Sequence, residues 1–211
     1  MEKDTDLPNN LKHYVSFENL ITILTNKALH LGDTKNWEDK NDAASVQAYA
    51  RHNSVQVGVL CLTMGDESIH HWNTFAKGPT GCRIDFINST FQKAIKSCPD
   101  IMYNKMTYLK RDFDITKFKN TDYPFLKRKA YNCEDEYRIV WTGKGKPNPI
   151  PIEGLIKRIT ISPYIQDHAL KVIRKLLDET YGIKEVYKSA ILDDSHWTGK
   201  FIEKENKKSK K

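Results

Sequence analysis

The chain has 211 residues, 39% of them hydrophobic and 29% charged, with a formal net charge of +7, a balance typical of one soluble globular domain. No apolar run approaches the ~20 residues of a membrane span, and the acidic, polar start at Met1 is unlike a secretory signal. Four scattered cysteines without a CxxC pair argue against a disulfide scaffold and a zinc ribbon, so we expect a protein of the reducing cytoplasm.

Apolar periodicity predicts strands and helices in mixed order. In chain order, the expected elements are a strand at 11–15, a helix at 17–28 capped by Ser16, a polar loop at 36–42, a helix at 43–52, a strand at 55–63, a short helix at 68–76, a strand at 82–86, a helix from 88 to 95, strands at 101–109, 136–142 and 155–161, a helix at 165–181 and a strand at 183–191. Because the order is not a regular βαβ alternation, we predict an α+β domain with a largely antiparallel sheet. It should span 11–195, after an N-terminal extension at 1–10.

The positive charge is concentrated in two segments. Residues 105–129 hold eight basic and three acidic residues, and 200–211 hold six lysines and two glutamates. The first segment interleaves aromatic and basic residues, a pattern suited to stacking unpaired bases and contacting phosphates. The candidate nucleic-acid-binding residues are Lys110, Arg111, Lys127, Arg128 and Lys129. The tail at 196–211 equally fits a solvated, disordered segment.

Two short motifs contain groups suited to chemistry. His13 ends a short strand before a capped helix, where it could donate to a ribose or phosphate, or serve only the structure. Glu134 and Glu136 are two residues apart, so a strand would place both on one side. Paired carboxylates can stabilise the cationic centre formed when a glycosidic bond breaks, or form a solvated edge paired with Arg138.

The segment 64–81 combines adjacent histidines, aromatic residues and a glycine turn. Trp72 and Phe75 could wall a pocket for a planar ring or belong to the core. The side chains of His70 and His71 should diverge, so a metal site is not expected there. Phosphate-loop, dinucleotide-binding, zinc-protease and serine-hydrolase signatures are absent from the sequence.

Taken in order, these motifs resemble a widespread uncharacterised bacterial family with the pattern HY[ST], IL, ND, CxS, WxxY, GxxIxF and ExE[WY]R. The matching segments are 13–16, 23–24, 41–42, 61–63, 72–75, 81–86 and 134–138, within a resemblance over about 11–192. Phe75 stands where the family has tyrosine, and the glutamate expected after Asp42 is missing.

That family is in turn similar to the ADP-ribosyltransferase-like fold, a mixed, mainly antiparallel split sheet with flanking helices. The resemblance implies an NAD-dependent ADP-ribosyltransferase. His13 would bind the NAD ribose with Tyr14 and Ser16 nearby, and Trp72 or Phe75 would stack on nicotinamide. Glu136 would be the catalytic glutamate, and Glu134 would orient the acceptor.

The basic segments favour a nucleic acid as acceptor, single-stranded DNA or RNA. Transferases of this kind tend to be toxins or phage-defence effectors, which implies a neutralising, less basic protein partner. Two alternatives stay open. A non-enzymatic nucleic-acid-binding module would explain only the basic segments, and a metal-dependent nuclease would use Asp39, Asp42, Glu134 and Glu136. For the transferase we expect no metal and no membrane contact.

Overall fold

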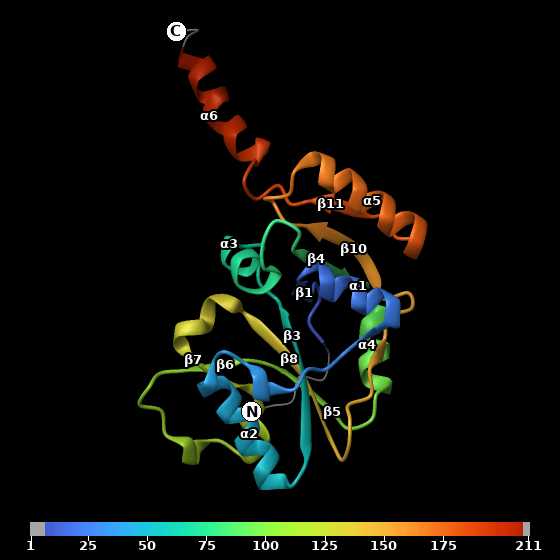
Figure 1. Ribbon diagram of the computed structural model, residues 1–211. Helices are drawn as coiled ribbons and strands as arrows, with labels where there is room; N and C mark the ends of the chain where they lie inside the picture. The colour runs from blue at the N-terminus through green and yellow to red at the C-terminus, as the bar shows by residue number, and fades with distance from the viewer. Residues whose placement is uncertain (1–6, 209–211) are drawn as a thin grey trace.

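The computed structural model describes residues 7–208 and is built on a seven-stranded sheet in the order β11-β10-β4-β1-β3-β8-β5 (Figure 1). The strands are β1 (Lys12–Val15), β3 (Gln56–Thr63), β4 (Cys82–Phe86), β5 (Ile101–Lys105), β8 (Glu136–Gly143), β10 (Ile156–Ile161) and β11 (Val186–Lys188). All neighbours are antiparallel except β10 and β11. The predicted mixed fold with a mainly antiparallel sheet is therefore confirmed.

Helices cover both faces of the sheet (Figure 1). On one face, α1 (Phe17–Asn26), α4 (Asn88–Ser97) and α5 (Asp167–Tyr181) pack over the larger apolar core. The opposite face is covered by α2 (Lys40–Asn53) over a smaller core, and by α3 (Ile69–His71) with the π-helical turn η2 (Trp72–Ala76) beside β1. The central strands β3 and β8 are thus buried on both faces, which is why most of their residues are apolar on both sides.

Short elements complete the chain. Two small sheets pair β2 (Ala28–Leu29) with β9 (Ile150–Pro151), and β6 (Thr107–Leu109) with β7 (Leu126–Arg128). The 3₁₀ helices are η1 (Thr34–Asn36), η3 (Ile115–Lys117), η4 (Asn120–Phe125) and η5 (Lys129–Glu134). The basic, aromatic segment after β5 is therefore an irregular layer that folds back onto α2 and β8.

Several expected boundaries agree with the structure, and others differ for local reasons. The Ser16 hydroxyl accepts the Asn19 N–H and caps α1, and Gly182 ends α5 in the left-handed conformation. The single strand expected at 101–109 divides at Met106, whose N–H bonds to the carbonyl of Glu136. The strand expected at 183–191 is limited to β11.

The C-terminal residues also differ from expectation. Residues 196–208, expected within a disordered tail, belong to α6 (Ser195–Lys208), which projects away from the body (Figure 1). Residues 209–211 of that tail and 1–6 of the N-terminal extension lie outside the described residues. Within 7–208, none of the helices combines the length and apolar character that crossing a bilayer requires.

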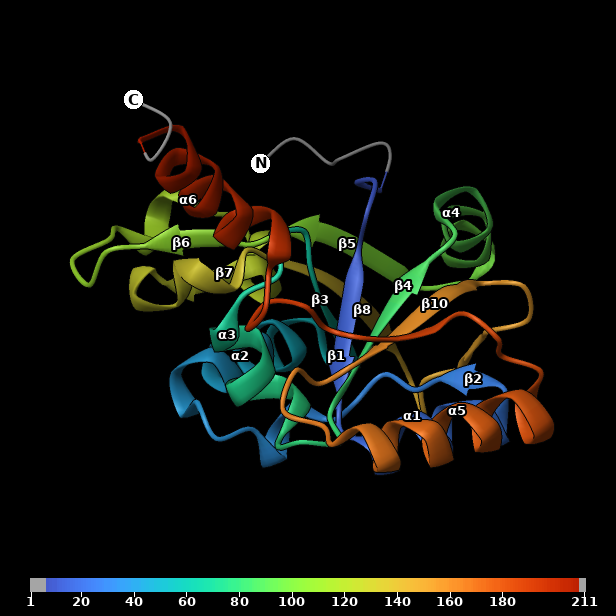
Figure 2. The same cartoon turned by 90° about the horizontal axis from the view of Figure 1, so that it is seen from above.

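The sheet is nearly divided between β1 and β3, which lie together at its centre (Figure 2). All four residues of β1 pair with β4, but only Lys12 pairs with β3, through Thr63. Farther along β3, Gly32 exchanges two backbone hydrogen bonds with Val59, of 2.8 and 2.9 Å. Gly32 thus pairs with a part of β3 that β1 leaves unpaired.

Candidate catalytic site

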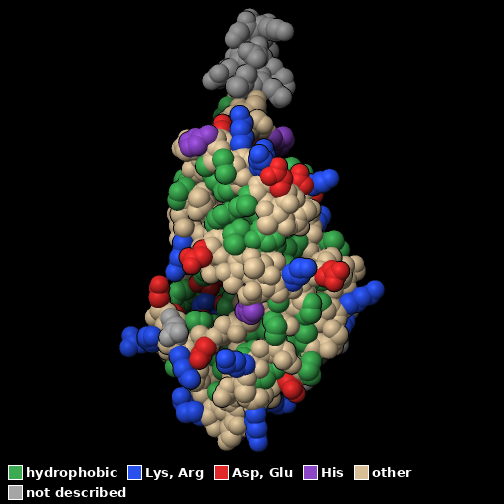
Figure 3. Space-filling view, turned by 45° about the vertical axis from the view of Figure 1, so that its right-hand side comes forward, with side chains coloured by type: hydrophobic (Ala, Val, Ile, Leu, Met, Phe, Trp, Pro, Cys, Tyr) green, Lys and Arg blue, Asp and Glu red, His purple; other side chains and the backbone are tan. Residues whose placement is uncertain are grey.

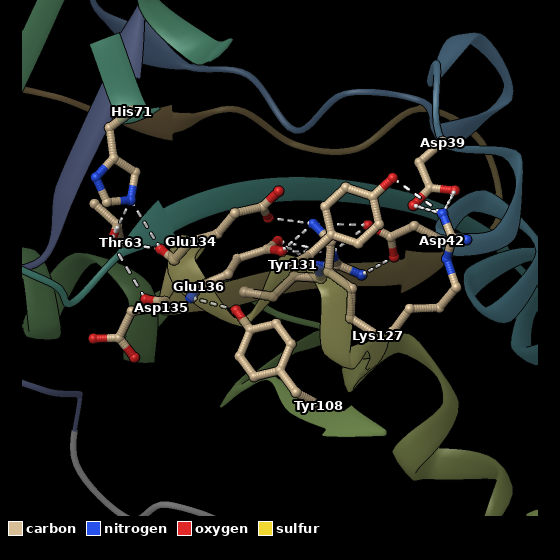
Figure 4. Close-up of polar contacts among 12 residues, drawn as sticks. Asp39, Asp42, Thr63, His71, Tyr108, Lys127, Tyr131, Glu134, Asp135 and Glu136 are labelled. Atoms are coloured by element: carbon tan, nitrogen blue, oxygen red, sulfur yellow. Dashed lines mark hydrogen bonds and ion pairs between the residues drawn. The ribbon is translucent and has the colours of Figure 1, made fainter. Parts of the chain in front are cut away.

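Five charged side chains converge on the face of the sheet that α2 covers (Figure 4). They come from the first turn of α2 (Asp42), from β7 (Lys127), from the end of η5 (Glu134) and from β8 (Glu136 and Arg138). Each side chain is at most 8% exposed. A buried charge is costly unless it is paired, so we expect the five side chains to assemble together.

The ammonium of Lys127 occupies the point where the three carboxylates meet. Its Nζ lies 2.5 Å from Glu134 Oε2, 2.9 Å from Glu136 Oε2 and 3.2 Å from Asp42 Oδ2. The ring of Tyr131 lies near the same nitrogen, with its centroid 5.1 Å away. Lys127 therefore holds η5, β8 and α2 together electrostatically.

Arg138 fixes the other side of the cluster. Its guanidinium is bidentate to Asp42, with two bonds of 2.9 Å, and bonds Glu136 through Nε at 2.8 Å and Nη2 at 3.0 Å. Nη1 also donates to the carbonyl of Pro124, and the ring of Trp37 lies 5.0 Å from the guanidinium carbon. These contacts account for all five N–H groups of the arginine.

The two glutamates have unlike electrostatic environments. Burial alone would raise the pKa of Glu136, but the charges of Arg138 and Lys127 outweigh it and hold this pKa at about 2. Burial raises the pKa of Glu134, and its contact with Lys127 offsets only part of that effect. Glu136 is therefore a fixed anion, whereas Glu134 is the carboxyl group that can exchange a proton nearer neutral pH.

Glu134 also has a carboxylate oxygen to spare. Oε2 contacts Lys127, and Figure 4 shows the other oxygen directed away from that contact. No described residue donates a hydrogen bond to this second oxygen. With all groups ionised, three carboxylates face two cations, so the cluster keeps one unbalanced negative charge that favours a cationic centre in a ligand.

The proximity of the two glutamates has a different origin from the one the sequence suggested. We expected them to alternate within one strand, but β8 begins at Glu136 and Glu134 belongs to η5. Between them, Asp135 is in the left-handed region with φ 41°. The carboxylates meet because both bind Lys127, and Thr63 anchors the turn by donating to the carbonyl of Glu134 at 2.8 Å.

Four of the five expected nucleic-acid-binding residues are exposed, namely Lys110, Arg111, Arg128 and Lys129. Two of the five, Lys127 and Arg128, pair with carboxylates. The Lys127 ammonium contacts three carboxylates inside the cluster, so it is not directed at a phosphate in this arrangement. Arg128 pairs with Asp39 at 3.3 Å and donates to the Tyr131 hydroxyl at 3.0 Å, so it is not a free cation either. Over the face seen in Figure 3, blue and red side chains are interspersed, without a field of one sign.

His13 and Glu136 do not face one cleft. Residues paired across strands share a side of the sheet, so Lys12, Thr63 and Glu136 lie on the α2 side, and His13 on the other. The His13 ring instead lies in the split, with Nδ1 2.9 Å from the Cys61 carbonyl oxygen. It lines a cavity of about 220 Å³ that also includes residues of α1. This arrangement therefore does not match the expectation that these two residues line one NAD site.

The other expected cofactor residues serve packing or capping. Tyr14 is buried, stacked on His71 with centroids 5.1 Å apart, and in edge contact with Trp72. Trp72 is 1% exposed and donates its Nε1 hydrogen to Glu67, so its ring has no open face for nicotinamide. Phe75 is half-buried beside His70 and His71. The hydroxyl of Ser16 is used by the α1 cap.

Sequence reasoning named Arg138 only as a partner of a solvated acidic edge, and it missed Trp37 as a site residue. It placed Lys127 and Asp42 in different kinds of site. Arg138 follows Glu136 by two residues in β8, and this alternation is a usable signal for a shared face. Nothing local links Asp42 to Arg138, since 96 residues separate them.

Comparison of the chain with protein-family models, curated proteins and solved structures finds no match. Within the part of the chain that the structure describes, no three His, Cys, Asp or Glu side chains are arranged to hold a metal ion. The carboxylates proposed as nuclease ligands surround an ammonium instead, and Asp39 faces Arg128.

His13 makes a testable contribution to the pH dependence of stability. Burial lowers its pKa to about 4, outweighing the Cys61 carbonyl, while an unfolded histidine titrates near 6.5. Between these values the unfolded chain binds a proton that the folded chain does not, so stability falls as pH falls from about 6.5 to 4, by at most about 3 kcal/mol. Urea unfolding at several pH values measures how the free energy of unfolding depends on pH. This dependence should be weaker for His13→Gln than for the wild type. An equal dependence in both proteins would contradict a His13 ring that stays neutral in the folded chain.

Proposed function

We propose that the cluster around Lys127 is the catalytic centre of an NAD-dependent ADP-ribosyltransferase. The observation that carries this proposal is the unlike pair of carboxyl groups. Glu136 is locked as an anion by Arg138 and Lys127, and Glu134 combines a raised pKa with one unbonded oxygen. Adjacent carboxyl groups whose pKa values are pushed apart are the usual arrangement for glycosidic-bond chemistry.

The proposed reaction uses Glu134 as the reacting carboxylate. The bond between the ribose C1′ and the nicotinamide nitrogen breaks, and its electron pair neutralises the pyridinium ring. The resulting oxocarbenium cation is stabilised by the unbonded oxygen of Glu134 and by the unbalanced negative charge of the cluster. The acceptor then bonds to C1′ and gives its proton to Glu134, whose raised pKa suits it to that step.

The remaining residues of the cluster position Glu134. Arg138 binds Glu136 and Asp42, these two carboxylates hold Lys127, and Lys127 orients Glu134. This proposal gives Glu134 the role that the family resemblance implies for Glu136. The split between β1 and β3 is a second feature that fits the resemblance, although His13 in this split would not contact the reacting centre.

A nucleic acid remains the acceptor that we propose, contacted through the exposed Lys110, Arg111 and Lys129. A toxin or phage-defence effector with a neutralising protein partner is the corresponding biological role. The same exposed cations favour a second candidate, a nucleic-acid-binding module without enzymatic activity.

The decisive experiment is incubation with NAD labelled in its adenylate half, together with single-stranded DNA, RNA and a protein mixture. We expect release of free nicotinamide and transfer of the label to one acceptor. The Glu134→Gln variant is the negative control. Binding of the protein to the nucleic acid without nicotinamide release would support the binding module instead. Cleavage of the nucleic acid that EDTA abolishes would support the nuclease and contradict the transferase.

A further inference from the structure

A second polar site lies outside the carboxylate cluster, at the junction of β1, β4 and β10. A cavity of about 420 Å³ opens there, and the charged residues that line it are Lys12, Asp85, Lys157 and Arg158. Asn10 and Asn88 add amide groups to its wall. The volume lies within the range of small-molecule sites and exceeds what a single side chain would need.

The only carboxylate among these lining residues is already neutralised. Asp85 Oδ2 accepts from Arg158 Nε at 2.6 Å and from Arg83 Nη2 at 3.2 Å. Arg83 is buried, does not line the cavity and also pairs with Glu67 at 3.0 Å, so it contributes no surplus charge to the wall. The wall therefore carries three positive charges and one negative charge.

Lys12 and Lys157 both lack a carboxylate partner among the described residues, and Lys12 is the more buried of the two. The Lys12 Nζ donates to the carbonyl of Gly65 at 2.6 Å, and no carboxylate among the described residues is within ion-pair distance of it. An ammonium has three donors, so two remain for a ligand. Burial, followed by the nearby charge of Arg83, lowers the pKa of Lys12, and a bound anion would reverse that effect.

Strand register places two of the cations on either side of Asp85. Lys12 pairs with Asp85 from β1, and Arg158 pairs with it from β10, so all three share one side of the sheet. Two strand spacings separate the backbones of Lys12 and Arg158 by about 10 Å. Two long cationic side chains at that separation can close on one tetrahedral anion, with the arginine fork supplying two of its donors.

We propose that this cavity binds a phosphoryl group, carried either by a nucleotide or by a nucleic-acid backbone. The inference does not depend on the proposed role of Glu134, because none of the residues that line the cavity belongs to the carboxylate cluster.

The test is calorimetric titration with inorganic pyrophosphate at low ionic strength, for the full chain. Lys12→Met and the double variant Lys157→Gln/Arg158→Gln should each weaken binding by roughly tenfold or more, as expected for the loss of charge-assisted hydrogen bonds. The matched control is Lys144→Gln/Lys146→Gln, which removes the same number of exposed cations from a loop outside the cavity and should leave the affinity unchanged. Lys157 and Arg158 are exposed, so their variant tests the site even if Lys12→Met fails to fold.

Equal weakening in the double variant and the control would show nonspecific charge attraction and overturn the proposal, as would the absence of pyrophosphate binding to the wild type. Titrations with AMP, adenosine and a single-stranded oligothymidylate then identify the source. AMP binding without adenosine binding supports a nucleotide site, and oligonucleotide binding alone supports a backbone site. If nicotinamide release fails while pyrophosphate binds, the enzymatic proposal fails and this one stands.

Discussion

Replacing Arg138 with methionine is expected to lower the free energy of unfolding by about 3–5 kcal/mol, the usual cost of leaving buried charges uncompensated. Arg138 is 0% exposed, and its guanidinium donates two hydrogen bonds to Asp42 and two to Glu136. Without it, three buried carboxylates would share only Lys127. Methionine fills much of the volume, so the loss should reflect charge more than a cavity. Urea unfolding at neutral pH measures it.

The matched control is Arg128→Met. Arg128 also pairs with an aspartate, but its side chain is 52% exposed, so the change should stay within about 0.5 kcal/mol. Adding Asp42→Asn and Glu136→Gln to Arg138→Met should recover part of the lost stability, because fewer unpaired charges then remain buried. A loss below about 1 kcal/mol for Arg138→Met would show that the network does not hold α2 to β8.

The elements that local signals determine were the ones that the sequence predicted well. The cap at Ser16 and the left-handed Gly182 depend on residues within one turn, and both are present. By contrast, whether His13 and Glu136 share a side depends on the register of β1 with β3. That register depends on partners about 50 residues away, and a shift of one residue would reverse it.

The site was predictable only in part for a related reason. Its two glutamates could be identified from their spacing, although Asp135 breaks the strand geometry used to argue their proximity. Lys127 was predicted as a phosphate contact because the sequence shows that it is charged but does not show which side chains surround it. Its partner Asp42 lies in α2, far along the chain, and the segment from 110 to 129 must fold back onto that helix before the pair can form.

Glu134→Gln is expected to slow nicotinamide release by about 10²–10⁴-fold, the usual contribution of a positioned acid or base. The glutamine carbonyl can still accept from Lys127, so the midpoint of thermal unfolding should change little. NAD binding should also survive, because the lost charge matters chiefly in the transition state, so kcat should fall while KM holds. Glu153→Gln, in an exposed turn, is the matched control and should keep full activity.

The pH profile gives a second readout of the same residue. Glu134 must be ionised to stabilise the cation, so wild-type turnover should decline as pH falls through its raised pKa. Residual turnover in Glu134→Gln should lack that acidic limb.

Glu136→Gln separates the two carboxylates. Its pKa near 2 means that it stays charged where Glu134 titrates, and it bonds both Lys127 and Arg138. The substitution should therefore lower stability together with activity, since it removes the anion that both cations need. The opposite pattern would be decisive. If Glu136→Gln abolishes nicotinamide release with an unchanged unfolding midpoint while Glu134→Gln remains active, then Glu136 is the reacting carboxylate, and Lys127 must release it when the substrate binds.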